Sequence, residues 1–316
     1  MNFNDRGGIQ SVLKRALQKK DIFDKFFCFG LIKCKYSNME LQALEIRNKK
    51  YNKIQRKYKK FLNELNYKNT ENEDNTINEN VWICWFQGLD NAPNIIKICI
   101  NSIFKHLNDK KIHIITEKNY SDYVKIPEYI IKKWKQGVIS YAHFSDILRT
   151  ELLVEYGGLW VDATTYMTGE IPKIIYKEPL FLLEFKCRED ITILKNSWFI
   201  YAQKNNRTLK IVRDLLYQYW LREKNLSEYF LWHFFVTMAL RKYPEDYKKI
   251  VYINEEDSHL LLYNFFNQYS KEYWEQIKKN TSIHKVSYYK FFTEDTKMPK
   301  KVSNTYYDYF IKGKLD

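Results

Sequence analysis

The chain has 316 residues, of which 45% are hydrophobic and 17% aromatic. This composition excludes a disordered chain and is sufficient for one large domain or two smaller ones. The formal net charge is +14, which favours an anionic partner such as a nucleic acid, a phosphorylated substrate or an acidic membrane surface. A lysine-rich solvated surface has the same composition, so charge alone leaves these alternatives open.

The cysteine and hydropathy patterns predict a compartment. The five cysteines form no C-x-x-C pair, which is typical of reduced thiols in a cytosolic protein. No uninterrupted apolar run reaches about 18 residues, so no membrane span is expected. The stretch MNFNDRGGIQSVLKRALQKK at the start lacks the apolar core of a signal peptide.

Residues 1–80 are predicted to be a basic helical extension with a polar linker, and residues 81–316 to be the main domain. Residues 1–66 contain 16 Lys and Arg against 6 Asp and Glu. The run 39–65 lacks Pro and Gly and repeats apolar residues at helical spacing, which predicts one long amphipathic helix after one or two shorter ones. These helices either dock on a membrane or a partner, or they pack on the main domain as a helical layer.

From Val81 the pattern alternates between strands and helices. Strands are predicted at 81–86, 111–116 and 159–161, and helices at 94–107, 127–137 and 141–156. This alternation predicts an α/β fold with a parallel, doubly wound sheet, in which ligands bind beyond the carboxyl ends of the strands. From about residue 190 the chain is expected to be largely helical. The sequence contains no G-x-G-x-x-G and no G-x-x-x-x-G-K-[ST], so the usual dinucleotide and P-loop folds are not indicated.

The stretch SYAHFSDILRTELLVEYGGLWVDATTY, residues 140–166, carries the candidate site. Asp146 and Arg149 are three residues apart and project from one side of the predicted helix. Gly157 is placed for a left-handed helix end, and Asp162 follows the short strand at its carboxyl edge. A carboxylate at that edge suits Mg²⁺ or Mn²⁺, which take oxygen ligands. The alternative is structural: Asp146 pairs with Arg149, and Asp162 caps a turn.

The order of three segments, VWICWFQG, AHFSDILRTELLVEYGGLWVDATT and IHKVSYYK, resembles the capsular polysaccharide synthesis proteins. These proteins are relatives of the family 32 retaining glycosyltransferases and of the clostridial glucosylating toxins. The resemblance covers about residues 81–290, and its central motif is S-D-x-x-R followed by G-G-x-x-x-D. It implies a GT-A fold, which is a Rossmann-like domain that binds a nucleotide sugar. The full expectation is such a domain with a helical amino-terminal extension and a helix-rich carboxyl-terminal part.

The resemblance also implies roles for individual residues. Asp146 and Arg149 would bond the hydroxyls of the donor sugar, and Asp162 would contact a Mn²⁺ or Mg²⁺ ion or the ribose-diphosphate. His284 and Lys285 match a late H-K pair that supplies a metal ligand and a diphosphate contact. The nucleotide-binding segment of the family is matched by Trp85, Phe86, Gln87 and Gly88. Asn196 matches a residue near the donor sugar. His233 is a histidine that faces either the acceptor or the core.

Three further points concern the chemistry. Where many relatives have D-x-D, this chain has D-A-T, so one carboxylate is missing and the need for a metal is left open. Thr150 lies one turn after Asp146 and is expected to influence the choice between galactose and glucose donors. Glu184 and Asp190 are candidate nucleophiles, although same-face attack assisted by the leaving group requires none.

The predicted function is a retaining hexosyltransferase of bacterial capsule or exopolysaccharide synthesis. It would move galactose or glucose from a UDP-sugar to an undecaprenyl-diphosphate-linked saccharide at the cytoplasmic face of the plasma membrane, where basic residues favour an anionic surface. No nucleic-acid partner is expected, because the charge surplus lies outside the domain that carries the site and no nucleic-acid motif is present. A basic nucleic-acid-binding protein and a non-catalytic glycan-binding module are the alternatives.

Overall fold

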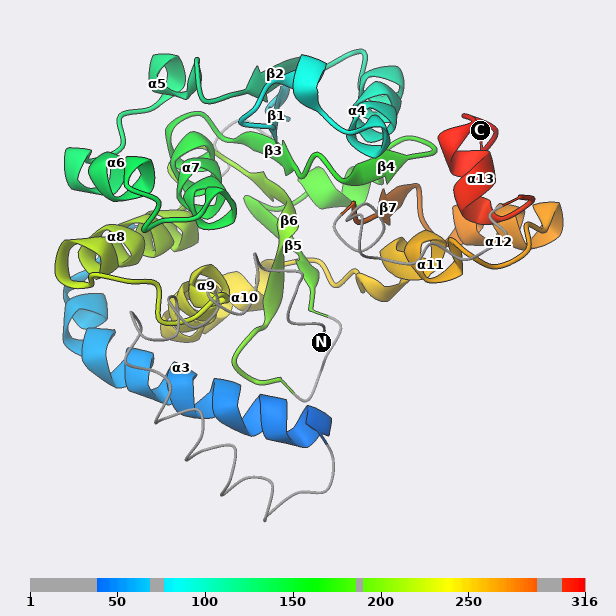
Figure 1. The fold of residues 1–316 in the computed structure, drawn as a ribbon. Coiled ribbons are helices and arrows are strands. Elements are labelled where there is room, and N and C mark those ends of the chain that lie inside the picture. The colour runs from blue at the N-terminus through cyan, green and yellow to red at the C-terminus, as the bar shows by residue number, and fades with distance from the viewer. Residues whose placement is uncertain (1–38, 69–76, 186–189, 289–302, 316) are drawn as a thin grey trace, which may run out of the picture.

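The computed structural model describes residues 39–68, 77–185, 190–288 and 303–315. The short helices expected before residue 39 lie outside these ranges. The described residues form an α/β fold with one central sheet and helices on both of its faces (Figure 1).

The central sheet has five strands in the order β2-β1-β3-β6-β5. The strands are β1 (Asn80–Cys84), β2 (Lys111–Ile115), β3 (Gly158–Val161), β5 (Leu180–Glu184) and β6 (Lys195–Ala202). β1 pairs in parallel with β2 and β3, whereas β6 runs antiparallel to both β3 and β5. The carboxyl ends of β1, β3 and β5 therefore share one edge with the amino-terminal end of β6.

The expectation of a wholly parallel sheet is wrong, because β6 runs against its neighbours. The largely helical part of the chain also begins later than expected, at α8 (Arg207–Arg222), since β6 occupies residues 195–202. All eight residues of β6 are buried. A strand buried on both faces lacks the alternation of polar and apolar residues, so its periodicity does not distinguish it from a buried helix.

One face of the sheet is covered by α6 (Glu128–Lys135), α7 (Tyr141–Glu155), α8 and α9 (Leu231–Lys242), and α3 (Met39–Glu64) lies across α8 and α9 (Figure 1). The Tyr51 ring meets Phe234 edge-on at 5.3 Å, and the Tyr58 ring meets Phe235 at 5.8 Å. Tyr51, Ile54, Tyr58 and Leu62 are all buried in this core. Of the two alternatives for the long helix, the packed layer is the one that the described residues adopt.

The opposite face carries α4 (Asn94–His106) and the carboxyl-terminal helices α11 (Glu256–Asn264), α12 (Lys271–Asn280) and α13 (Tyr306–Ile311). A second, two-stranded sheet pairs β4 (Thr165–Met167) antiparallel with β7 (Ile283–Lys285). The remaining short elements are η2 (Leu89–Asn91), α5 (Tyr120–Tyr123), η3 (Lys173–Tyr176) and α10 (Pro244–Lys249). Across the described ranges, no helix is both long and apolar enough for a membrane crossing.

The turn from α7 into β3 fixes where β3 enters the sheet. Ser140 caps the start of α7 by accepting a hydrogen bond from the N–H of His143 (3.3 Å). At the other end, Gly157 has φ +69° and Gly158 has φ +101°, which confirms the left-handed helix end predicted for Gly157. A Cβ on Gly158 would lie 2.3 Å from the carbonyl oxygen of Asn80. Gly158 therefore allows β3 to lie directly against β1.

We expect Gly158→Ala to lower the free energy of unfolding by roughly 3 kcal/mol or more, because it adds a backbone clash to an unfavourable φ. Gly137→Ala is the matched control, since Gly137 has φ +73° but no atom within 4 Å of its Cβ position. That variant retains only the conformational cost of about 1–2 kcal/mol. Urea unfolding of both variants measures the difference, and equal losses would show that the close approach to β1 carries no cost.

Candidate functional site

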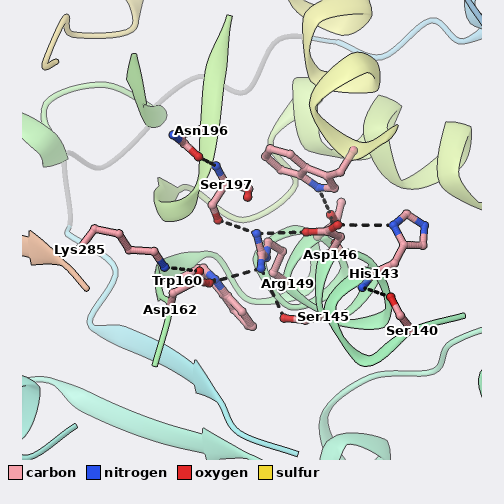
Figure 2. Close-up of polar contacts among 12 residues, drawn as sticks. Ser140, His143, Ser145, Asp146, Arg149, Trp160, Asp162, Asn196, Ser197 and Lys285 are labelled. Atoms are coloured by element: carbon pink, nitrogen blue, oxygen red, sulfur yellow. Dashed lines mark hydrogen bonds and ion pairs between the residues drawn. The ribbon is translucent and has the colours of Figure 1, made fainter. Parts of the chain in front are cut away.

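Four segments bring polar groups to the carboxyl edge of β3 (Figure 2). Asp162 follows β3 directly, and Lys285 ends β7. Asp146 and Arg149 project from α7, and Ser197 belongs to the first residues of β6. Because β6 is antiparallel to β3, its beginning lies beside Asp162, whose backbone N–H donates to the carbonyl oxygen of Trp198 (2.9 Å).

Asp162 is the centre of this network. Its Oδ1 accepts hydrogen bonds from Trp160 Nε1 (2.9 Å) and from Arg149 Nη2 (3.3 Å). Its Oδ2 accepts a hydrogen bond from Lys285 Nζ (2.7 Å). Burial opposes ionisation of this carboxyl, but the charges of Lys285 and Arg149 outweigh it and lower the pKa of Asp162 below its ordinary value. Asp162 is therefore a carboxylate with a cation on each oxygen.

Lys285 is held from three sides. Besides Asp162, its Nζ donates to Thr164 Oγ1 (2.6 Å), and it lies 5.3 Å from the centre of the Trp198 ring. An ammonium group has three N–H donors, and Asp162 and Thr164 take two of them. One donor of Lys285 therefore remains for a further acceptor.

Arg149 joins α7 to the edge of the sheet. Its Nη1 donates to the carbonyl oxygen of Ser197 (2.7 Å) and lies 3.2 Å from Asp146 Oδ1. Its guanidinium also stands 4.9 Å from the centre of the Trp160 ring. The prediction that Asp146 and Arg149 lie together on one face of a helix is confirmed. The two side chains form the ion pair that the structural alternative predicted. Arg149 also contacts Asp162 at the carboxyl edge of β3.

His143 was not among the residues predicted from the sequence. Its Nε2 accepts a hydrogen bond from Trp220 Nε1 (3.0 Å), which assigns the proton of the neutral ring to Nδ1. That nitrogen lies 3.4 Å from Asp146 Oδ2. The spacing of three residues between His143 and Asp146 is a helical signal that could have identified the pair.

Thr150 and His233 lie deeper, between α7 and α9. Thr150 is fully buried, and its hydroxyl donates to the carbonyl oxygen of Asp146 (2.7 Å) and accepts from Trp232 Nε1 (2.8 Å). The buried His233 ring packs against the rings of Phe230 and Trp232. The structure thus makes Thr150 a neighbour of the Asp146 backbone. Its influence on donor choice and the acceptor role of His233 stay predictions.

The predicted nucleotide segment follows β1 at the same edge of the sheet. The Trp85 ring meets the edge of the Tyr288 ring at 5.4 Å. Phe86 is buried against aromatic side chains that include Trp134 and Phe144, so its side chain belongs to the core. Gln87 is exposed, and Gly88 turns the chain with φ +79°. Trp85 is therefore the less buried of the two aromatic side chains in this segment, half-buried at the margin of the core.

Asn196 contacts a residue that the sequence did not single out. Its Nδ2 donates to Glu255 Oε2, which also accepts from Trp198 Nε1 (3.1 Å). The Glu255 side chain is buried. By holding residues on both sides of Ser197, Glu255 fixes the beginning of β6 against Arg149 and Asp162. No local pattern indicates this role, because the partners are more than fifty residues apart.

Glu184 and Asp190, the candidate nucleophiles, both have cationic partners within the chain. Glu184 pairs with Lys195 and accepts a hydrogen bond from the Tyr247 hydroxyl (3.2 Å). Asp190 is buried and pairs with Arg47 of α3. These contacts give both carboxylates structural roles at the β5–β6 connection.

The sequence profile of the family described as Capsular polysaccharide synthesis protein matches residues 32–310. The chain belongs to this family. It is also similar to O-glycosyltransferase braB of Annulohypoxylon truncatum, with 26% identity over 164 residues that cover 46% of this chain and 38% of that relative. The match thus spans well under half of the relative's length.

Two solved glycosyltransferase structures are similar to this chain at low sequence identity and low TM-score. The structure titled PaToxG Glycosyltransferase has a TM-score of 0.39 and 19% identity, over 55% of this chain and 73% of its own. The apo form of the glycosyltransferase GlyE from Streptococcus pneumoniae TIGR4 has a TM-score of 0.41 and 11% identity, over 76% of this chain and 62% of its own.

The described residues of this capsular polysaccharide synthesis protein do not fit a metal ion held by Asp162 and His284. The His284 ring is fully buried, its Nε2 lies 2.9 Å from Thr168 Oγ1, and it packs on Trp274. Successive residues of a strand point to opposite faces, so Lys285 reaches Asp162 and His284 does not. In the described ranges, no cluster of three His, Cys, Asp or Glu side chains could hold an ion. The metal requirement stays a prediction.

Two of the buried histidines, His233 and His284, predict a loss of stability in weak acid. Burial lowers the pKa of His233 to about 4 and that of His284 to about 3. Both rings are neutral in the folded chain, whereas the unfolded chain takes up protons below pH of about 6.5. Stability is therefore full above about pH 6.5 and falls toward the folded pKa values.

Between pH 7 and pH 5 we expect each histidine to reduce the free energy of unfolding by about 2 kcal/mol. Urea unfolding at the two pH values measures the loss, and His233→Gln and His284→Gln should each reduce it by about 2 kcal/mol. A loss that neither variant changes would contradict this assignment.

Glu255→Leu should lower the free energy of unfolding by about 2–4 kcal/mol, because it leaves the buried N–H groups of Asn196 and Trp198 without their acceptor. Glu255→Gln keeps an acceptor oxygen and should lose less than half as much. The control is Glu256→Leu, since the neighbouring Glu256 is exposed and bonds only to Asn254. Thermal or urea unfolding compares the three, and equal losses for the two leucine variants would contradict the role of Glu255.

Proposed function

We propose that this chain is a glycosyltransferase of capsular polysaccharide synthesis with a GT-A fold, which transfers a hexose from a UDP-sugar with retention of configuration. The observation that carries the proposal is the joining of Asp146, Arg149, Asp162 and Lys285 at the carboxyl edge of β3. In an open α/β sheet this edge is where ligands bind. Family membership and the glycosyltransferase names of the similar proteins support the same reaction.

The chemistry follows from what each group can donate or accept. In the reaction, the bond between sugar C1 and the diphosphate oxygen breaks, and the electron pair stays on that oxygen. The acceptor hydroxyl forms the new bond to C1 from the same face, and its proton passes to the departing diphosphate. The Lys285 ammonium, with one unused N–H, would stabilise the charge that develops on the diphosphate.

The donor sugar would contact the α7 side of the network. Asp146 can accept hydrogen bonds from sugar hydroxyls, and its ion pair with Arg149 orients it. Thr150 bonds the Asp146 carbonyl oxygen, so it would influence donor choice through the position of Asp146. Trp85, at the carboxyl end of β1, is the proposed stacking partner of the uracil base.

The proposed acceptor is an undecaprenyl-diphosphate-linked saccharide at the cytoplasmic face of the plasma membrane. The 16 Lys and Arg among residues 1–66 favour an anionic lipid surface. Two other functions are distinguished by binding measurements. Salt-sensitive DNA binding without UDP binding would favour a nucleic-acid-binding protein. Sugar binding without UDP would favour a non-catalytic glycan-binding module.

The test is UDP-sugar hydrolysis and transfer across a donor panel that includes UDP-glucose and UDP-galactose. Asp162→Asn and Asp146→Asn should each reduce turnover about 10²-fold or more, on the scale of a lost transition-state contact. Asp122→Asn is the control, because Asp122 is an exposed residue of α5. Near-normal turnover in Asp162→Asn would show that the reaction occurs elsewhere, and the absence of turnover with every donor would contradict the proposed activity.

A further inference from the structure

Asp162 is the carboxylate that directly follows β3, and both of its oxygens are already bonded to protein cations. Asp162 Oδ1 accepts from Arg149 (3.3 Å) and Oδ2 accepts from Lys285 (2.7 Å). Oδ1 also accepts from Trp160, so its two lone pairs are both occupied. The remaining lone pair of Oδ2 lies beside the Lys285 ammonium, so that a divalent cation bound there would be repelled by this charge unless Lys285 moved away.

Two described positions near Asp162 that could supply further metal ligands are also committed to other contacts. Two residues after Asp162 the chain has Thr164, whose hydroxyl oxygen accepts from the Lys285 ammonium (2.6 Å). His284 faces the opposite side of β7 and packs on Trp274. Asp162 and Thr164 thus both accept hydrogen bonds from Lys285. The antiparallel pairing of Thr165 with Lys285 fixes the position of Lys285 along β4.

We propose that Lys285 takes the place of a divalent cation at the donor diphosphate, with Asp162 as its anchor, so that the chain binds nucleoside diphosphate without a metal. This inference rests on the proposed function for the identity of the donor. It assigns Asp162 to positioning the ammonium group, and it assigns the diphosphate contact to the remaining N–H of Lys285.

The surroundings of Lys285 suit this role. The side chain is 17% exposed, so its charge is screened less than that of a surface lysine. The Trp198 ring on one side and Asp162 on the other limit its rotamers, so little conformational freedom is lost when the diphosphate arrives. A charge-assisted hydrogen bond of this kind is about twice as strong as a neutral one.

Calorimetric titration of UDP tests the inference directly. In EDTA, the wild-type chain should bind UDP with a Kd within about 2-fold of the Kd measured in Mn²⁺. Lys285→Ala and Lys285→Met should both weaken UDP binding in EDTA by about 10-fold or more, the effect of losing a charge-assisted hydrogen bond. The matched control is Lys278→Ala, because Lys278 also lies over a tryptophan ring, that of Trp274, and pairs with Glu275.

A second titration uses Mn²⁺ alone and needs no nucleotide. We expect the wild-type chain and Asp162→Asn to give the same heat on addition of Mn²⁺, because Asp162 does not bind the ion. If Asp162→Asn removes binding heat that the wild-type chain gives, or if wild-type UDP binding strengthens about 10-fold or more on adding Mn²⁺, the inference is overturned. If UDP binds in neither medium, the proposed donor is wrong, and the Mn²⁺ titration still decides whether Asp162 holds an ion. Thermal melting of each variant separates lost contacts from lost folding.

Discussion

The ion triplet of Arg149, Asp162 and Lys285 is the interaction on which the candidate site depends. A carboxylate that is three-quarters buried is costly unless its charge is matched. Here each oxygen meets a cation, and the cations come from α7 and β7. The pairing therefore does more than lower the pKa of one aspartate, because it ties a helix, the main sheet and the small sheet together at one point.

The rest of the fold serves to hold these groups in register. Gly158 lets β3 approach β1, which brings Asp162 to the sheet edge. The antiparallel direction of β6 places its first residues next to Asp162, where backbone carbonyl groups are available to Arg149. On the far side of α8 and α9, α3 completes the core and reaches the β5–β6 connection through Arg47. The amino-terminal helix thus supports the connection that leads into β6.

The sequence predicts the parts of this arrangement that depend on local signals. The lengths of α3 and α7, the left-handed Gly157, the short apolar β3 and the carboxylate after it all follow from spacing and residue type. The direction of β6 does not, because antiparallel and parallel strands buried on both faces have the same composition. The sequence also does not predict which of His284 and Lys285 points toward Asp162, because the pairing of β7 with β4 determines which side chain faces that way. Glu255 and its partners belong to distant segments, so only the folded chain brings them together.

The distance along the chain between β3 and β7 has a consequence for the order of folding during synthesis. Asp162 and Lys285 are 123 residues apart, and closing so long a loop carries an entropic cost that only later contacts can offset. During synthesis β3 leaves the ribosome well before β7. Until β7 pairs with β4, Asp162 has Arg149 as its cationic neighbour and lacks its second one. The nascent chain would therefore form its central sheet first and complete the ion triplet of the candidate site only after β7 has been made.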